Sequence, residues 1–175
     1  HIETIKMPHF TELKIYNEFN KKDYYIIGVD SAKSLTGDFC AIEIYEYSSF
    51  RQMAEFSGRI GSLTKYSEIV KFIVDVLVKR IGHRILLAIE NNSIGNTVIE
   101  NLENERKNNY MRYLYSPNPD KSLGISTNKQ TKELMVSLLY EYLTNDPKSI
   151  KSGDLINQLT VIEKRFNGTI AAQSG

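Results

Sequence analysis

Two apolar segments of the chain end in acidic residues, and carboxylates in such positions can bind a metal ion. Asp30 follows Tyr24–Val29 (YYIIGV), and Glu90 closes the segment RILLAIE that begins at Arg84. A carboxylate at the end of a buried strand is costly unless hydrogen bonds or a cation compensate it. If both carboxylates lie at one edge of a sheet, they repel each other, which raises a pKa or requires a cation between them.

A third acidic residue, Asp38, follows Gly37 after a short turn, and a hairpin would place it beside Asp30. Mg²⁺ and Mn²⁺ prefer oxygen ligands, and two such ions about 3.5–4 Å apart can clamp both oxygens of a phosphodiester displacement. We therefore expect Asp30 to be a shared ligand of two metal ions, with Glu90 and Asp38 as further ligands and catalytic residues. The alternative is that all three are ordinary polar residues of turns and strand ends.

The pattern of apolar residues predicts the elements that must position these carboxylates. Three short β-branched and aromatic segments favour an antiparallel meander. After them, apolar residues spaced three, four and seven positions apart indicate an amphipathic helix. The remainder alternates between strands and helices. The predicted strands are 24–29, 39–47, 50–60, 84–90 and 110–116, and the predicted helices are 65–80, 97–107, about 127–144 and about 154–166.

This order predicts an α/β fold, with a mixed sheet of an antiparallel three-strand meander plus parallel strands, flanked by helices. The strand that ends at Asp30 would be central, and the strand that ends at Glu90 would run parallel to it. The carboxyl ends of adjacent parallel strands form the functional crevice in such sheets. Asp30 and Glu90 are both expected at that edge.

Composition limits the class of protein. The chain has 175 residues, 41% of them hydrophobic, a formal net charge of +1 and one cysteine, Cys40. This size suits one domain, and a single cysteine excludes a disulfide framework. No apolar run reaches the roughly 20 residues that span a bilayer, and no signal peptide is recognisable. Residues 1–22 are expected to be a lead-in or linker before a domain at 23–175. Because the first residue is His1, we expect the chain to be part of a longer protein.

Several polar residues near the predicted edge could contact DNA. Asn91 and Asn92 follow Glu90 into a helix, where amides can bind a phosphate, although both are also common capping residues. Lys121, Lys129 and Lys132 flank the start of the third helix and could contact a DNA backbone, although a solvated helix face is the alternative. The chain has no Gly-rich phosphate loop with Lys and Ser or Thr, so we expect no ATP hydrolysis.

Four blocks of sequence resemble a known family, the C-terminal nuclease domain of the large terminase subunit of tailed phages. The likeness runs from about Tyr24 to the last residue, and its first two blocks are the more specific. The blocks are IIGVDSAKSLTGDFCAIEIY, LLAIENNSIGNTVIENL, LGISTNKQTKELMVSLLYEYL and LINQLTVIEKRFNGTIAAQSG.

The resemblance implies an RNase H-like fold and a metal-dependent endonuclease that cuts concatemeric viral DNA. Asp30, Glu90 and Asp38 match acidic residues of the family site, and the start of the helix at Thr127–Lys132 is implied to face DNA. Implied partners are double-stranded DNA, an ATPase domain upstream in the same polypeptide, the portal and the small terminase subunit. The implied location is the cytoplasm of a bacterial host, for a phage or prophage protein.

One departure from the family concerns a third acidic ligand. Family members carry a further aspartate just after an AA-x-x-G segment, and here AAQSG is the end of the sequence. The C-terminal end of the family domain is therefore expected to be missing, with weak or no cleavage and weak metal binding by these 175 residues. Two alternatives remain open: another RNase H-like nuclease, such as a resolvase or transposase core, or an inactive DNA-binding or docking module of that fold.

Overall fold

The structure is a computed structural model, and it describes residues 1–30, 39–128, 137, 141, 144–145 and 151–152. The chain divides into two compact units, residues 1–128 and residues 129–175. All the strands and helices with defined bounds belong to the first unit. In the second unit, Ser137, Glu141, Thr144 and Asn145 are helical, in line with the predicted helix there. The rest of that helix, and the helix predicted at about 154–166, lie outside the described residues.

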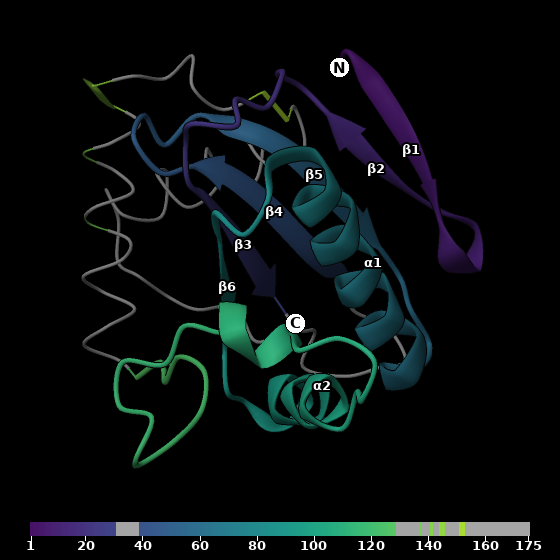
Figure 1. The fold of residues 1–175 in the computed structure, drawn as a ribbon, viewed down its shortest axis with the longest axis vertical. Coiled ribbons are helices and arrows are strands. Elements are labelled where there is room, and N and C mark those ends of the chain that lie inside the picture. Colours follow the sequence, from purple (N-terminus) through teal and green to yellow (C-terminus); the bar gives the residue numbers. More distant parts are fainter. Residues whose placement is uncertain (31–38, 129–136, 138–140, 142–143, 146–150, 153–175) are drawn as a thin grey trace, which may run out of the picture. The chain divides into compact units, whose positions relative to one another are not determined.

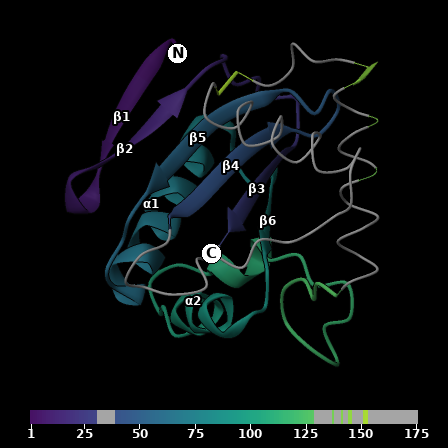
Figure 2. The same ribbon diagram turned by 180° about the vertical axis from the view of Figure 1, so that it is seen from behind.

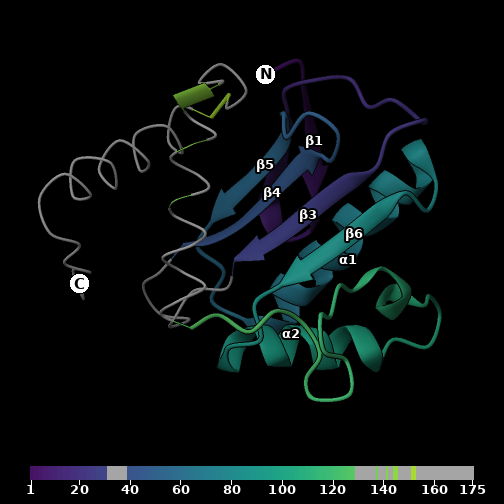
Figure 3. The same ribbon diagram turned by 90° about the vertical axis from the view of Figure 1, so that its left-hand side faces the viewer.

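The first unit is built on a mixed six-stranded sheet with the order β1-β2-β5-β4-β3-β6. Its centre is the predicted antiparallel meander of β3 (Tyr25–Asp30), β4 (Cys40–Glu46) and β5 (Gln52–Gly58). The predicted parallel partner of β3 is also present as β6 (Ile85–Ile89), and Figure 3 shows these two strands side by side. The prediction of a mixed α/β sheet is confirmed.

The strands β3 and β4 each bury one face more deeply than the other. In β3, Tyr25, Ile27 and Val29 are buried, whereas Ile26 and Gly28 are only half-buried. β4 alternates in the same way. This alternation gives these strands a core face and a more open face.

The core face of the sheet is covered by α1 (Leu63–Ile81), which lies in front of the sheet in Figure 1 and behind it in Figure 2. The helix begins at Ser62, whose side chain accepts a hydrogen bond from the Lys65 N–H, and it ends at Gly82. Gly82 has φ +77°, a conformation that glycine adopts without strain. The amphipathic spacing had predicted this helix over 65–80, and the prediction is confirmed. Its buried side chains are Tyr66, Ser67, Ile69, Val70, Ile73, Val74, Leu77 and Ile81.

The second helix lies earlier in the chain than predicted. It was expected at 97–107 and is found as α2 at Ser93–Glu103. Asn92 explains the earlier start, because its side chain accepts a hydrogen bond from the Gly95 N–H and caps the helix. No helix in the described part of the chain is long and apolar enough to cross a membrane.

Residues 1–22 differ from the expected lead-in. β1 (Glu3–Met7), a 3₁₀ turn at Pro8–Phe10 and β2 (Thr11–Ile15) form a hairpin that extends the sheet beyond β5. Leu13 and Ile15 are buried in the common core. This hairpin was missed because apolar residues alternate with charged ones over only a few positions, so no continuous apolar segment marks it.

The prediction of a strand at 110–116 is also wrong. Tyr110–Tyr113 forms a 3₁₀ helix, and within residues 110–116 only an isolated parallel bridge between Leu114 and Leu87 pairs with the sheet. Tyr110 and Tyr113 are both buried, and their spacing of three residues suits a 3₁₀ turn, whereas a strand would direct them to opposite faces. Their hydroxyl groups contact Asp75 and His83, respectively.

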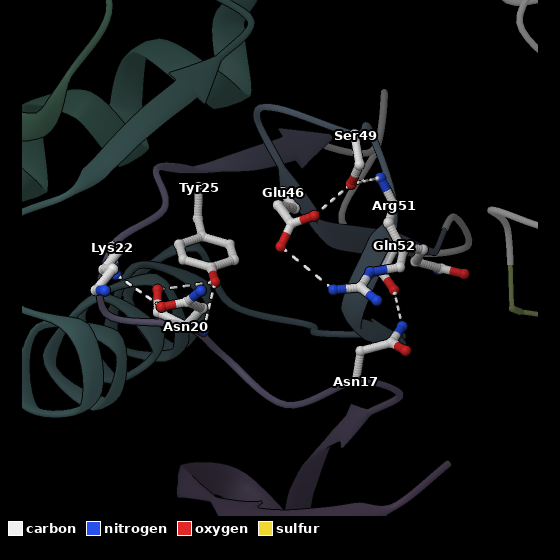
Figure 4. A network of polar contacts seen from close by, with 8 residues as sticks. All are labelled: Asn17, Asn20, Lys22, Tyr25, Glu46, Ser49, Arg51 and Gln52. Carbon is white, nitrogen blue, oxygen red and sulfur yellow. Dashed lines mark hydrogen bonds and ion pairs between the residues drawn. The ribbon is translucent and has the colours of Figure 1, made fainter.

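A polar network closes the end of the sheet where β3 begins (Figure 4). The buried carboxylate of Glu46 accepts hydrogen bonds from Ser49 and from the Arg51 guanidinium, the latter over 3.3 Å. Asn17 donates to the Gln52 carbonyl at 2.8 Å. The contacts of Glu46 fix the turn between β4 and β5, and the Asn17 contact ties the segment after β2 to β5. We therefore assign this network a structural role.

Candidate functional site

Asp30 and Glu90 lie next to each other at the carboxyl edge of the sheet. Val29 pairs with Ile89 in the parallel register of β3 and β6, and each acidic residue is the next residue of its chain segment. Val29 and Ile89 are buried in the core, so strand alternation directs both carboxylates to the open face. Neighbouring strands are about 4.8 Å apart, which is close enough for two carboxylates to share a cation.

A tyrosine from α1 holds the backbone at Asp30. The Tyr66 hydroxyl donates to the Asp30 carbonyl at 2.7 Å and to the Ala41 carbonyl at 3.1 Å. Burial raises the pKa of Tyr66 well above its ordinary value, and electrostatic interactions with Cys40 and Asp30 add to the effect. The hydroxyl therefore stays protonated, and it ties the end of β3 to the start of β4. The Asp30 side chain itself is exposed at this edge.

The Glu90 carboxylate is oriented by two neighbours. The Thr127 hydroxyl donates to Glu90 Oε1, and the Asn92 amide donates to Oε2 at 3.4 Å. A Cβ atom at Gly95 would lie 1.7 Å from the Glu90 carbonyl, so only glycine permits the helix to start this close to the strand. The sequence placed Thr127 at the start of a predicted helix, and the structure adds its contact with Glu90.

Asn91 and Asn92 both have local structural contacts. The Asn91 amide donates to the Leu123 carbonyl at 3.2 Å and to the Ser126 hydroxyl at 3.0 Å, which fixes the segment after α2 against β6. Asn92 Oδ1 accepts from the Gly95 N–H at 2.7 Å. These contacts match the alternative interpretation of the two residues as capping and turn residues. A DNA contact by either stays a prediction.

The remaining predicted site residues are only partly described. Lys121 is exposed in a turn, where its backbone N–H donates to the Asn118 carbonyl at 2.9 Å. Asp38, Lys129 and Lys132 lie outside the described residues. Within the part of the chain that the structure describes, no three or more His, Cys, Asp or Glu residues form a group that could hold a metal ion.

The donor set at the edge nevertheless fits a hard cation. Asp30 and Glu90 supply carboxylate oxygens from two adjacent strands, and no sulfur or imidazole ligand is involved. Such oxygen sets suit Mg²⁺ or Mn²⁺, which commonly bind one or two carboxylates and complete their shell with water and substrate oxygens. Chemically, the arrangement can hold a cation beside a bound phosphate.

A second pair of acidic residues lies on the open face, and the sequence did not predict it. Glu43 on β4 pairs with Glu55 on β5. The Gln52 amide donates to Glu43 Oε2 at 2.8 Å, and the Tyr16 hydroxyl donates to Glu55 Oε2 at 2.7 Å. Burial, together with the charge of Glu55 and a hydrogen bond with it, raises the pKa of Glu43 to about 8, although the Gln52 bond opposes the shift. The Glu43 carboxyl therefore keeps its proton at neutral pH.

No protein-family model matches the chain, and no curated protein matches its sequence. The functional interpretation therefore depends on the residues and their geometry. Its main support is the pair Asp30 and Glu90, which the topology of the sheet brings to one edge.

Proposed function

We propose that this chain is the metal-dependent endonuclease domain of a viral DNA-packaging terminase, with an RNase H-like fold. The observation that carries the proposal is the position of Asp30 and Glu90 on neighbouring parallel strands of a mixed sheet. The antiparallel meander that precedes the parallel strand supports the same fold. The reaction is hydrolysis of a phosphodiester bond in double-stranded DNA.

In this proposal, Asp30 and Glu90 hold Mg²⁺ or Mn²⁺, with Asp38 as a further ligand. The bound metal supplies charge neutralisation at the phosphate and activation of a water molecule. The chain's own contribution is positioning. Tyr66 fixes the backbone of Asp30, and Thr127 and Asn92 orient the carboxylate of Glu90. Hydrogen bonds from neighbouring groups to the ligand residues set the geometry of metal sites in proteins.

The resemblance of the sequence blocks supports the terminase assignment within this reaction class. It adds concatemeric viral DNA as substrate and an ATPase domain upstream in the same polypeptide. It further adds the portal and the small terminase subunit as partners, and the cytoplasm of a bacterial host as location. These statements are part of the proposal, and a Walker-type ATPase encoded before His1 would support them directly.

A cleavage assay on supercoiled plasmid tests the reaction. The purified 175-residue chain is incubated with Mn²⁺ or Mg²⁺ at high protein concentration, and nicked and linear products are followed over hours. We expect weak metal-dependent cleavage that falls at least tenfold in Asp30→Asn and in Glu90→Gln, since each change removes a negatively charged ligand. Glu100→Gln, an exposed carboxylate on α2, is the matched control and should cut like the unchanged chain.

Two results would count against the proposed nuclease function. Cleavage that persists in Asp30→Asn would mean that another group performs the reaction or that a contaminating nuclease is present. DNA binding without any cleavage, and without binding of Mn²⁺, would favour the inactive DNA-binding module.

A further inference from the structure

We propose that Phe39 and Arg59 form a DNA contact site beside the two carboxylates; this inference rests on the proposed nuclease function. The ligand is a DNA strand. Arg59 pairs with a phosphate a few nucleotides from the one that is cleaved, and the ring of Phe39 packs against a nucleotide between them. The two residues are called the Phe39–Arg59 pair below.

The strand register places this pair at the same edge as Asp30. Cys40 pairs with Gly58 at the ends of β4 and β5, and Phe39 and Arg59 are the next residues outward. Asp30 pairs with Ala41, which is two residues from Phe39 on the same strand face. Cys40 is buried in the core, so alternation directs Phe39 to the open face, as it does Asp30.

The register also sets the number of nucleotides between the two contacts. Arg59 is two strands from Asp30 and two residues further along the strand direction. Strand spacings of about 4.8 Å and a rise of about 7 Å per two residues place the two backbone positions about 12 Å apart. Because DNA rises about 3.4 Å per nucleotide along each strand, a phosphate at Arg59 lies about three nucleotides from a phosphate held at Asp30 and Glu90.

The contacts of the pair suit this ligand. The Arg59 guanidinium lies 4.9 Å from the centre of the Phe39 ring, and 57% of Phe39 is exposed. In the part of the chain that the structure describes, Arg59 forms no ion pair with a carboxylate. Its planar fork of N–H groups matches two phosphate oxygens, and an exposed ring offers a stacking surface to a base or sugar.

Charge explains why a cation is needed at this edge. Asp30 and Glu90 repel a DNA backbone unless metal ions and basic side chains compensate them. The chain as a whole has a net charge of only +1, so its overall field does not attract DNA strongly. The Arg59 guanidinium, two strands from Asp30 at the same edge of the sheet, supplies local positive charge where a phosphate must approach.

The chain contains a matched control for this pair. Arg84 lies 5.1 Å from the centre of the Tyr24 ring, and Tyr24 is 58% exposed. Tyr24 precedes β3 and Arg84 precedes β6, so this second cation–π pair lies at the opposite edge of the sheet. The cation–π geometry and ring exposure are similar, and the pair lies far from the carboxylates, although Arg84 also donates to the Lys22 carbonyl at 3.0 Å.

The experiment measures DNA binding apart from cleavage. Fluorescence anisotropy follows a labelled 30-base-pair duplex bound by the 175-residue chain with Ca²⁺ in place of Mn²⁺, at several salt concentrations. We expect Arg59→Ala and Phe39→Ala to weaken binding at least fivefold. Arg59→Ala should also lower the slope of log K against log salt by about 0.9, which corresponds to one phosphate contact. Arg84→Ala and Tyr24→Ala should leave affinity and slope unchanged.

Two further variants separate folding from binding. Arg59→Lys keeps the charge and should retain the salt slope while losing part of the affinity, and Phe39→Leu keeps an apolar group without the aromatic face. Thermal unfolding of each variant checks that the fold is retained.

The outcomes distinguish this inference from the proposed function. If Asp30→Asn abolishes cleavage while the Phe39 and Arg59 variants bind DNA like the unchanged chain, the inference is wrong and the nuclease proposal stands. Equal losses in Arg59→Ala and Arg84→Ala would show diffuse charge attraction and would also overturn the inference. If Arg59→Ala alone weakens binding but no metal-dependent cleavage occurs, the contact site stands and the nuclease proposal fails. An unchanged chain that binds no DNA overturns both.

Discussion

Beside the acidic pair, Tyr66 is the residue that connects α1 to the candidate site through hydrogen bonds. Its hydroxyl bonds to the carbonyls of Asp30 and Ala41 at the point where β3 ends and β4 begins. Without this bond, two carbonyl groups near the core would lose a donor. The position of Asp30 therefore depends on a contact from behind the sheet.

We predict that Tyr66→Phe lowers the free energy of unfolding by about 1–3 kcal/mol, the usual cost of unsatisfied buried polar groups. It should also weaken Mn²⁺ binding several-fold, because the backbone at Asp30 loses its anchor. Chemical denaturation and calorimetric titration measure the two effects.

Tyr110→Phe is the matched control for Tyr66→Phe. Tyr110 is also buried, and its hydroxyl bonds to Asp75 at 2.9 and 3.0 Å, away from the candidate site. It should destabilise the fold to a similar extent without changing Mn²⁺ binding. Equal effects of both variants on metal binding would show that Tyr66 has only a general structural role.

Among the elements, the β4–β5 hairpin has an unusual pairing that predicts a pH dependence. Glu43 and Glu55 are directly opposed, and the pKa of Glu43 is raised to about 8, chiefly by burial. The ordinary value is 4.5, so the folded protein keeps a proton that the unfolded chain releases. Stability contributed by this group is fully present below about pH 4.5 and is lost as the pH rises toward about 8.

We predict that Glu43→Gln flattens this part of the pH profile. The difference in unfolding free energy between variant and unchanged chain should favour the variant increasingly from pH 5 to pH 8, by up to about 1.4 kcal/mol per pH unit. Urea denaturation at half-unit pH steps measures it. Parallel profiles for the two proteins would show that Glu43 titrates normally. The control variant is Glu12→Gln, which removes a negative charge on the exposed side of β2.

The hairpin also shows why part of the site could not be predicted. The register shifts by one residue between Ile44 and Tyr45. A regular hairpin continued from the Tyr45 and Gln52 pair would set Glu43 opposite Ala54, whereas the bulge brings Glu55 there. A single bulge is not visible in the apolar pattern. The Phe39–Arg59 pair depends on the same register and was missed for the same reason.

Elements with a long or continuous apolar pattern were predicted well. α1 and the strands β3 and β6 have such patterns, and the neighbouring positions of Asp30 and Glu90 follow from them. The N-terminal hairpin and the 3₁₀ turn at Tyr110–Tyr113 were not predicted, because their structure depends on pairing with β5 and on contacts with α1 and His83. Local pattern contains no information about such distant partners.

At the scale of the whole first unit, the candidate site and the residues that stabilise the fold occupy different parts of the sheet. α1 covers the core face, and the carboxyl ends of β3 and β6 carry the acidic pair. The Phe39–Arg59 pair lies at the same edge, at the start of β4 and the end of β5. The polar network around Glu46 closes the opposite end. Substitutions there should affect folding, whereas substitutions at the carboxyl edge should affect metal and DNA.

The most direct test of the central claim is a titration of the 175-residue chain with Mn²⁺, followed by electron paramagnetic resonance of the free ion. If Asp30 and Glu90 hold the metal together, Asp30→Asn and Glu90→Gln each weaken binding at least tenfold, and Glu100→Gln binds Mn²⁺ like the unchanged chain. If Asp30→Asn and Glu90→Gln bind Mn²⁺ as tightly as the unchanged chain, the two carboxylates are not a metal site and the account is wrong.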